Sequence, residues 1–421
     1  MSTVATAAVD RREVVSLFAR LRTGKGQADP LPTYERLMSM GEVIPVPWGG
    51  YLVTSYHLCH QVLRDKFWKV PDRGWRTGQA DAARWSSPAS LQMSDSLPML
   101  NPPDHTRRRR SLGNVFHQDS LVALRPSIET TVERLLDRFT DRLRHDPADF
   151  VDLVSEELPV ITIGEWMGIP SADYGLLRSL THDQAHTQEL FPTPTQLALS
   201  NTATRRLRHY FTDLIEERRN APGDDPVSSW LKTWDRLEPT RSVADEAVLS
   251  LAIFMILAAL ETTSYVLSGA VRLLLEHPQQ MELLRGNPEL IPDAIEETLR
   301  YDAPIHMISR VASEDTEVGG MPVPAGGMLM LMVGAAHHDP ARYADPQVFD
   351  VRRRARAQEH RHLSFGTGIH YCLGSALARL EAEVLLTSLL RRPDRFRLSA
   401  PPQWAARVAF RRLTSLQLAL A

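Results

Sequence analysis

One cysteine lies in a glycine-rich segment whose residue types suit a metal ligand. The segment reads F-G-T-G-I-H-Y-C-L-G over residues 365–374, and its cysteine is Cys372. Glycine allows the backbone to turn sharply and to approach a flat ligand closely. Backbone N–H groups of such a turn can point at a sulfur and tune it as a ligand. A helical pattern follows from Ser375 to Leu390, and because the N-terminus of a helix favours a thiolate, we expect Cys372 to bind a metal in that form.

This segment resembles the cysteine loop of the cytochrome P450 (haem-thiolate) family, F-G-x-G-x-H-x-C-x-G, at all six fixed positions. A chance match in a chain of this length has odds on the order of one in a hundred thousand. The other interpretations are a buried structural cysteine, a phosphate loop and a dinucleotide fingerprint. The fingerprint requires a glycine three residues after Gly368, where this chain has Tyr371.

The resemblance implies a haem b cofactor (iron protoporphyrin IX) with Cys372 as the axial ligand of the iron. Phe365 and Gly366 are the loop residues expected to help bind the haem. Four further groups match the residues that bind the haem propionates in the family: His105 and Arg109 in an H-x-x-x-R motif, Arg310 on a strand, and His370 in the cysteine loop. Carboxylates buried with a cofactor need such charge-assisted donors.

An acid and an arginine three residues apart, Glu297 and Arg300, share one face of a predicted helix. Taken alone, such a pair is a common solvated salt bridge. Its position before the cysteine matches the family's E-x-x-R, which is joined by an arginine from a later segment. The best match for that arginine is Arg353, with Arg352 as the alternative register. The resemblance implies a structural brace.

The sequence A-A-L-E-T-T over residues 258–263 places an acid beside hydroxyls inside an apolar helix, and burial of a charge is costly. It resembles the family's A-G-x-[D/E]-T, which makes Thr262 the alcohol that hydrogen-bonds the oxygen ligand and Glu261 the acid that takes part in proton delivery. The alternative is that Thr262 bonds its own i−4 carbonyl. Ala259 replaces the family's glycine and adds a methyl group near the oxygen site.

Helical periodicity dominates the rest of the chain. Amphipathic helices are predicted at Leu121–Leu143 and Leu207–Arg218, and a long central helix at about Val243–Leu275. Strand patterns are short, and they comprise a hairpin of Ile44–Val46 with Tyr51–Val53 and further strands at Thr316–Val318 and Met328–Met332. Trp68–Met99 shows no periodicity and is predicted as a long loop.

The predicted fold class is mainly α with a small β region. We expect a single domain over residues 1–421, with residues 1–29 as a loosely ordered N-terminal segment. The resemblance implies the cytochrome P450 fold, in which haem lies between the long central helix and the cysteine loop.

Composition excludes several other classes of protein. The chain has 421 residues, of which 43% are hydrophobic, and a net charge of −3, so nucleic acid is not an expected partner. Two cysteines, Cys59 and Cys372, are too few for a disulfide framework or a four-cysteine zinc site. The longest apolar run, Leu251–Leu260, is shorter than the ~18–20 residues that span a bilayer. We expect a cytoplasmic protein without a membrane partner.

The resemblance implies a monooxygenase that inserts one atom of dioxygen into a C–H bond or a double bond. Because the chain has no flavin or iron–sulfur pattern, electrons are expected from a separate ferredoxin and its reductase. Candidate docking residues are the basic side chains before the cysteine loop: Arg352, Arg353, Arg354, Arg356 and Arg361. The alternative for these residues is a solvated, codon-biased surface.

The expected substrate is a small molecule, a bulky apolar natural product of secondary metabolism such as antibiotic biosynthesis. Family position suggests five residues that line its pocket: Ala258, Leu260, Pro304, Ile308 and Phe410. Two other functions remain open at this point. One is a haem-thiolate enzyme that couples or cyclises its substrate, and the other is a non-enzymatic haem-binding sensor.

Overall fold

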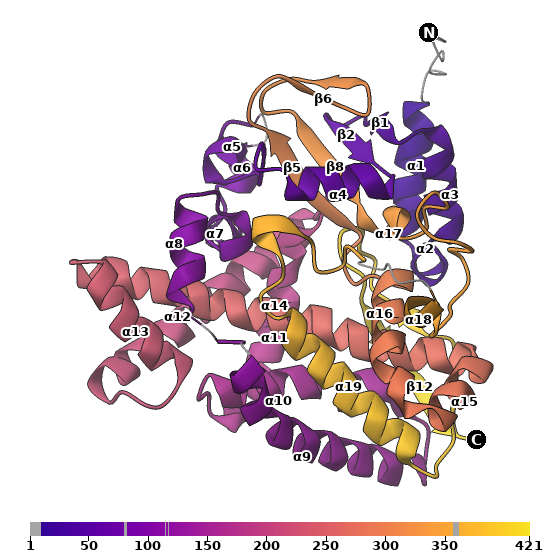
Figure 1. Ribbon diagram of the computed structural model, residues 1–421. Helices are drawn as coiled ribbons and strands as arrows, with labels where there is room; N and C mark the ends of the chain where they lie inside the picture. Colours follow the sequence, from indigo (N-terminus) through magenta and orange to yellow (C-terminus); the bar gives the residue numbers. More distant parts are fainter. Residues whose placement is uncertain (1–9, 80–81, 114, 117, 357–361) are drawn as a thin grey trace. The chain divides into compact units, whose positions relative to one another are not determined.

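The computed structural model describes residues 10–79, 82–113, 115–116, 118–356 and 362–421 (Figure 1). Contacts divide the chain into two compact units, and each unit draws on several stretches of sequence. Unit 1 comprises Met1–Pro71, Glu296–Cys372 and Pro402–Thr414. Unit 2 comprises Asp72–Ile295, Leu373–Pro401 and Ser415–Ala421.

Unit 1 is built on a five-stranded mixed sheet with the order β1-β2-β8-β5-β3. Its strands are β1 (Val43–Pro45), β2 (Tyr51–Val53), β3 (Trp68–Lys69), β5 (Met307–Ala312) and β8 (Met328–Met332). The β1–β2 hairpin confirms the prediction from sequence, and β2 runs parallel to β8 while β5 is antiparallel to β8 and β3. The predicted strand Thr316–Val318 forms β6, which pairs with β7 (Met321–Val323) in a separate hairpin.

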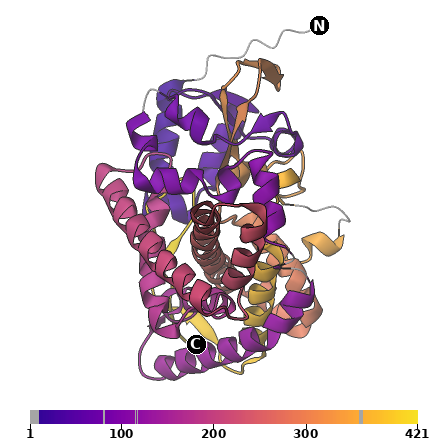
Figure 2. The ribbon, with the colours of Figure 1, turned by 90° about the vertical axis from the view of Figure 1, so that its left-hand side faces the viewer.

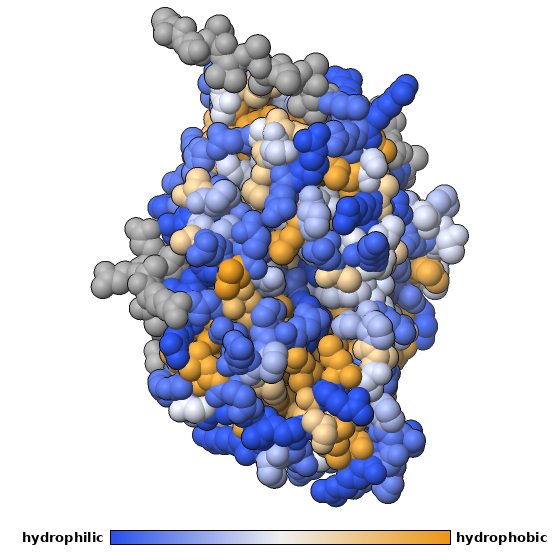
Figure 3. Space-filling model, turned by 90° about the vertical axis from the view of Figure 1, so that its right-hand side faces the viewer, coloured by the Kyte–Doolittle hydropathy of each residue, from blue (hydrophilic) through white to orange (hydrophobic). Residues whose placement is uncertain are grey.

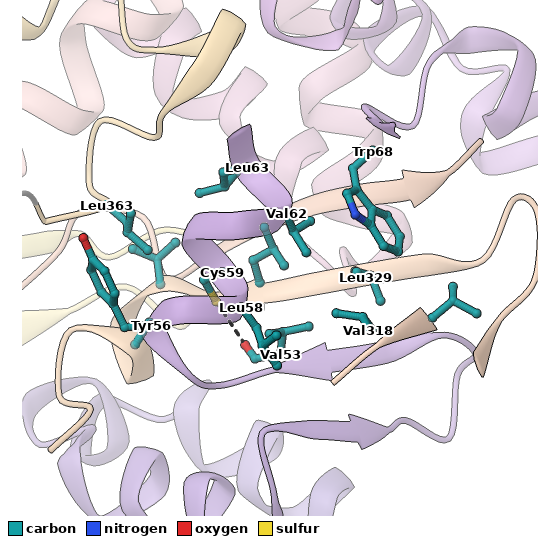
Figure 4. Close-up of a cluster of buried hydrophobic side chains, with 14 of the residues drawn as sticks. Val53, Tyr56, Leu58, Cys59, Val62, Leu63, Trp68, Val318, Leu329 and Leu363 are labelled. Carbon is teal, nitrogen blue, oxygen red and sulfur yellow. Dashed lines mark hydrogen bonds between the residues drawn. The ribbon is translucent and has the colours of Figure 1, made fainter. Parts of the chain in front are cut away.

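Helix α4 (Tyr56–Arg64) covers one face of this sheet (Figure 4). Its apolar side chains Cys59 and Val62 are almost fully buried, and they pack in one cluster with Leu329 of β8 and Leu363, which precedes the cysteine loop. Cys59 Sγ donates to Val53 O at 3.6 Å. Burial raises the pKa of this thiol, so Cys59 is an inert core residue.

Residues 11–21 and 24–28 are helical, which corrects the expectation of a loosely ordered segment up to residue 29. Helix α1 (Arg11–Leu21) begins where Asp10 Oδ1 accepts from Arg12 N at 2.8 Å, and α2 (Gly24–Ala28) follows. Val14, Phe18 and Leu21 are buried at i, i+4 and i+7, the spacing of one helix face. Residues 1–9 lie outside the described part of the chain.

Unit 2 is helical and centres on α14 (Arg241–Glu276), which is seen nearly end-on in Figure 2. The side chains of its middle, Leu251–Leu260, are apolar on every face, so this stretch needs packing partners on most sides. The helices of unit 2 that contact it include α10 (Glu157–Trp166), α11 (Tyr174–Gln184), α12 (Pro194–Asn220), α13 (Pro226–Leu237) and α19 (Ser375–Arg391). Helix α9 (Gln118–Leu143) packs on α10 and α19. These elements confirm the four helices predicted from periodicity, with α12 longer than expected.

Shorter elements complete the two units. Unit 2 also contains α8 (Asp104–Ser111), η2 (Val151–Ser155), η3 (Ser171–Asp173), η4 (Ala185–Gln188), α15 (Pro278–Gly286), η5 (Pro288–Leu290) and a sheet of β4 (Ala148–Asp149), β12 (Gln417–Leu420) and β9 (Phe396–Leu398). Unit 1 also contains α3 (Leu31–Met40), α17 (Val333–Ala336), α18 (Arg353–Arg356), η6 (Gly368–His370) and β10 (Gln403–Trp404). Helix α16 (Ile291–Tyr301) and strand β11 (Leu413–Ser415) belong partly to each unit.

The segment predicted as one long loop, Trp68–Met99, is instead a series of short elements. After β3 come α5 (Arg73–Thr77), α6 (Ala82–Trp85), α7 (Pro88–Ser94) and η1 (Leu97–Met99). Asp72 and Ser87 cap α5 and α7 by accepting from Trp75 N and Ser90 N. Helices of one or two turns are too short to show a 3.6-residue period, which is why the sequence pattern missed them.

Among the described residues, α14 is the one helix whose length and composition would allow it to cross a membrane. The run Leu251–Leu260 gave too short an apolar length for this helix, because most residues from Tyr265 to Leu274 are also apolar, with Arg272 among them. However, 67% of its most apolar window is buried inside the protein, as in the core helix of a soluble protein. On the face drawn in Figure 3, hydrophilic side chains predominate and apolar ones are scattered.

Candidate active site

The cysteine loop of unit 1 is closed by a backbone hydrogen bond in which Cys372 N donates to Phe365 O at 2.9 Å. Gly366 and Gly368 adopt φ values of +64° and +72°, which side chains other than glycine rarely accept. A Cβ atom on Gly368 would lie 2.7 Å from Leu63 O, at the end of α4. Glycine at these positions therefore allows the loop to fold tightly and to pack against α4.

The polypeptide that leads into this loop is also held by hydrogen bonds. Leu363 N donates to His337 Nε2 at 2.7 Å, and Ser364 Oγ donates to Leu299 O at 2.6 Å. Burial lowers the pKa of His337 well below its usual value, with the nearby His362 as the next cause. A neutral imidazole can accept through Nε2, so the low pKa of His337 preserves its bond to the loop.

Glu297 and two arginines form a buried network in unit 1. Arg300 binds Glu297 in a bidentate pair, with Nη2–Oε1 and Nε–Oε2 distances of 2.7 and 2.8 Å. Arg353 Nε donates to the same Oε1 at 3.1 Å, whereas Arg352 is exposed. Both guanidinium groups also donate to carbonyl oxygens of residues 337–348, namely His337, Ala344, Asp345, Pro346 and Val348. This network fastens α16 to the irregular segment before the cysteine loop.

Unit 1 contains a buried cation whose environment suits an anionic ligand. Arg310 on β5 is 5% exposed, and its guanidinium donates to the adjacent Ser309 O at 2.8 Å. Burial lowers the pKa of Arg310 to about 10. No carboxylate among the described residues lies within ion-pair distance of it. A buried, unpaired charge is costly, so a propionate of haem b fits this position.

The other expected haem ligands are divided between the two units. His370 lies in η6 of unit 1, and His105 and Arg109 lie on α8 of unit 2. His105 is 3% exposed. Burial lowers its pKa, with the charge of Arg109 as the second cause, so the two residues are neighbours as the H-x-x-x-R spacing predicts.

One face of α14 remains accessible in the middle of this otherwise buried helix. Ala258 is exposed, and Phe254, Ala259 and Thr262 are partly exposed. Their spacing of four, one and three residues places them on one stripe. Leu260 is 3% exposed and lies roughly 200° around the helix from Ala258. Leu260 and Ala258 therefore face nearly opposite sides of α14, and the expectation that both line one pocket stays a prediction.

The acid and the alcohol of α14 make different contacts. Thr262 Oγ1 donates to Ala258 O at 2.9 Å, which is the i−4 bond left open as an alternative from the sequence. Glu261 is 8% exposed, and its Oε1 lies 3.2 Å from Nδ1 of His182 on α11. His182 Nε2 lies 3.2 Å from Oε2 of Glu156. Two carboxylates of unit 2 therefore share one imidazole.

The three remaining pocket candidates lie close together in unit 1. Ile305 forms an isolated antiparallel bridge with Phe410, and Arg411 N donates to Pro304 O at 2.9 Å. Pro304 is buried, whereas Phe410 and Ile308 are partly exposed. This pairing brings Phe410 beside the start of β5 across a sequence separation of about a hundred residues.

Two residues of the site were not foreseen from the sequence, His182 and His337. Neither belongs to a motif, because each contributes through a contact with a residue far along the chain, Glu261 and Leu363 respectively. Such contacts between distant segments become visible only in the folded chain.

Comparisons with known proteins agree with this geometry. The sequence model of the family "Cytochrome P450" matches residues 187–415. The polyketide biosynthesis cytochrome P450 PksS of Bacillus subtilis is 34% identical over 410 residues, which is 96% of this chain and 95% of that protein. The cytochrome P450 monooxygenase PikC of Streptomyces venezuelae is 32% identical over 373 residues, 87% of this chain and 85% of that protein.

The fold leads to the same family. One similar solved structure is P450BioI in complex with an acyl carrier protein that carries hexadec-9Z-enoic acid. The two structures superpose with a TM-score of 0.85 at 29% sequence identity, and the match covers 94% of this chain and 100% of the P450BioI chain. The similarity therefore spans nearly the whole sequence and includes the cysteine loop and α14. We conclude that this chain belongs to the cytochrome P450 family and is a monooxygenase whose cofactor is haem b.

Proposed function

We propose that this protein is a haem-thiolate monooxygenase that hydroxylates or epoxidises a bulky, apolar natural product in secondary metabolism. The observation that carries the proposal is the cysteine loop, in which Cys372 N and Phe365 O close a turn through two glycines of positive φ. Such a turn leaves room for a flat cofactor at Cys372. When bound through a thiolate, haem activates dioxygen for insertion of one oxygen atom into the substrate.

The residues that would hold the haem lie in separate segments of the sequence. Cys372 would bind the iron, with Phe365 and Gly366 in the same loop. Arg310, His370, His105 and Arg109 would bind the two propionates. The argument is strongest for Arg310, because its guanidinium is buried and no carboxylate of the described residues lies within ion-pair distance. Glu261 and Thr262 would supply protons and a hydroxyl group beside the accessible stripe of α14.

The proposal of a bulky apolar substrate rests on the side chains that remain accessible. Ala258 on α14 and Ile308 and Phe410 in unit 1 are apolar and at least partly exposed. Pockets for small molecules are mostly apolar, with a few polar groups that fix orientation. The names of PksS and PikC place one of these relatives in polyketide biosynthesis and describe the other as a monooxygenase, which supports a substrate of that chemical class.

Electrons would arrive from a separate ferredoxin and its reductase. Ile369 and Tyr371 of the cysteine loop are 43% and 40% exposed, an apolar centre suited to a protein contact. Arg64, at the end of α4, and Arg352 and Arg354 are exposed cations of the same unit. Arg353 is turned into the Glu297 network, with 12% of its side chain exposed, so it does not fit a docking role. The side chain of Arg356 and all of Arg361 lie outside the described part of the chain.

Salt dependence tests this docking surface. A ferredoxin-supported rate of dioxygen consumption should fall between low and high ionic strength, because the Debye length shrinks from roughly 30 Å at 0.01 M to 10 Å at 0.1 M. Arg64→Gln should reduce the low-salt rate, whereas Arg11→Gln, which changes an exposed arginine of α1, is the matched control. A rate that is insensitive to salt would argue against docking by these arginines.

The overall proposal is tested by spectroscopy and by substrate screening. Purified protein should contain haem, and its reduced carbon-monoxide difference spectrum should have the form that thiolate ligation gives. A panel of apolar natural products should include compounds that shift the ferric iron from low to high spin by displacing bound water. A colourless protein, or one with haem but no thiolate spectrum, would refute the proposal.

A second candidate function is oxidative coupling or ring formation by the same cofactor. One observation that favours this function is the hydrogen bond from Thr262 Oγ1 to Ala258 O, because the hydroxyl proton is already engaged in it. The other is Ala259 in place of the family's glycine. Product mass distinguishes the two: insertion of oxygen adds one oxygen atom, whereas coupling or ring closure removes two hydrogen atoms.

We also propose that the chain is one cytoplasmic domain. Neither unit is a continuous segment, since the chain passes from one to the other after Pro71, Ile295, Cys372, Pro401 and Thr414. Both cysteines are free thiols, which fits a reducing compartment. A single transition in thermal unfolding, at the same temperature by haem absorbance and by circular dichroism, is the expected result for one domain.

A further inference from the structure

A chain of three ionisable side chains leads away from α14 inside unit 2. Glu261 Oε1, on α14, is hydrogen-bonded to His182 Nδ1 at 3.2 Å. Glu156 Oε2 lies 3.2 Å from His182 Nε2, at ion-pair distance but without the angles of a hydrogen bond. The side chains of Glu261, His182 and Glu156 are 8%, 19% and 10% exposed. An imidazole with a carboxylate at each nitrogen can accept a proton at one side and release one at the other.

The outer end of this chain leads towards solvent. Arg178 on α11 lies 3.9 Å from Glu156, 2.8 Å from Glu157 and 3.3 Å from Asp152. The Asp152 side chain is 61% exposed and that of Arg178 26%. The outer end of the path, at Asp152 and Arg178, is therefore more accessible than Glu261, His182 and Glu156. Arg178, Glu157 and Asp152 are charged groups of the described residues that lie beside Glu156.

A local irregularity of the backbone places Glu156 in the chain. The preceding residues, η2 (Val151–Ser155), form a π-helical turn, and Glu156 N donates to Val151 O at 3.0 Å. Ser155, which is fully buried, lies with its Oγ 3.4 Å from Oγ of Ser264 on α14. A π-helical turn rotates the residues that follow it, and such turns are frequent at functional sites. Here the turn packs on α14 with Glu156 next to it.

We propose that His182 positions Glu261 and conducts protons to it from Glu156. In this step neutral His182, with its proton on Nδ1, takes a proton at Nε2 from Glu156 and gives its Nδ1 proton to Glu261 Oε1. Rotation of the ring restores the starting tautomer, and Glu156 is reprotonated from water beside Asp152 and Arg178. One proton enters for each proton delivered, and no electron moves. The inference rests on the proposed function, because it supplies the acid whose protons the monooxygenase reaction consumes.

The competing interpretation is a brace that ties α11 to α14 and to the start of α10. A brace needs the hydrogen bonds but not the transfer of a proton. His182→Asn separates the two, because its amide nitrogen can replace Nδ1 as a donor to Glu261 and cannot conduct a proton. His182→Phe removes both functions. His209→Asn is the matched control, since the side chain of His209 is 81% exposed beside Asp213 on α12.

The kinetic experiment uses the haem-loaded enzyme with a surrogate plant-type ferredoxin and its reductase. Dioxygen consumption is followed as a function of pH in H2O and in D2O. A positioned proton donor contributes 10²–10⁴-fold in typical enzymes, so His182→Asn should slow consumption at least tenfold and change the solvent isotope effect, with melting temperature and haem content unchanged. A rate, pH profile and isotope effect equal to those of the wild type and His209→Asn would overturn the proposal.

An NMR experiment tests the same contacts without turnover. Histidine labelled with ¹⁵N is followed in the diamagnetic ferrous carbon-monoxide form, with His182→Asn used to assign the resonance. Glu156→Gln and Glu261→Gln each remove an adjacent negative charge and should each lower the pKa of His182. If neither variant moves that titration, the path does not exist in solution. A protein without a thiolate spectrum would instead refute the proposed function, and the titration would still decide this inference.

Discussion

Glu381 provides the most quantitative test of the structure. It lies on α19, which begins three residues after Cys372, and it is 2% exposed. Burial raises the pKa of its carboxyl from 4.5 to about 7, and hydrogen bonding with Thr162 of α10 opposes that rise. The folded protein therefore holds this proton more tightly than the unfolded chain does, and Glu381→Gln should remove the resulting pH dependence.

The sign and size follow from proton linkage. Below pH 4.5 the carboxyl is protonated in both states and contributes its full stability, which is lost as the pH rises through about 7. Each pKa unit corresponds to about 1.4 kcal/mol, so the wild type should lose about 3 kcal/mol of unfolding free energy relative to Glu381→Gln between pH 4.5 and 8. Replacing the carboxyl by an amide also changes the unfolding free energy by an amount that does not depend on pH. This amount cancels when the change between pH 4.5 and 8 is compared for the two proteins.

The assay is urea unfolding of the ferric, haem-loaded protein by far-ultraviolet circular dichroism at pH 5, 6, 7 and 8. Glu383→Gln is the matched control, because Glu383 is on the same helix with 37% of its side chain exposed and pairs with Arg125 at 3.0 Å. The difference between Glu381→Gln and wild type should grow with pH, while Glu383→Gln remains parallel to the wild type. Parallel curves for all three proteins would mean that Glu381 is ionised in the folded state and that the reasoning from burial is wrong.

Three further predictions concern the active site and its supporting network. Cys372→Ala should abolish the thiolate form of the reduced carbon-monoxide difference spectrum, and a normal spectrum would remove the assignment of the ligand. Thr262→Ala should retain haem but divert electrons to hydrogen peroxide, measured as peroxide formed per dioxygen consumed; full coupling would assign the role to Glu261 or to a substrate hydroxyl. Glu297→Gln should lower the unfolding free energy by about 3–5 kcal/mol, because it leaves buried cations without their carboxylate. Urea unfolding against the exposed control Glu289→Gln measures it, and a loss below about 1 kcal/mol would show that carbonyl oxygens suffice for Arg300 and Arg353.

The sequence determined the elements whose signals are local. The long helix α14, the amphipathic α9 and the β1–β2 hairpin all carry their periodicity or turn residues within themselves. The cysteine loop belongs to this class, because its glycines have to adopt positive φ wherever the loop lies. The short helices between Trp68 and Met99 carried no such signal, since one or two turns leave no period to detect.

The tertiary structure decided the contacts between residues that are far apart along the chain. Sequence alone could not choose between Arg352 and Arg353, and the choice follows from which side chain the segment after residue 337 turns towards Glu297. In the same way, Leu260 turned out to be buried and His182 was joined to Glu261 and Glu156 from three separate elements. A motif records the chemistry that one segment can perform, whereas burial and pairing depend on what the rest of the chain packs against it.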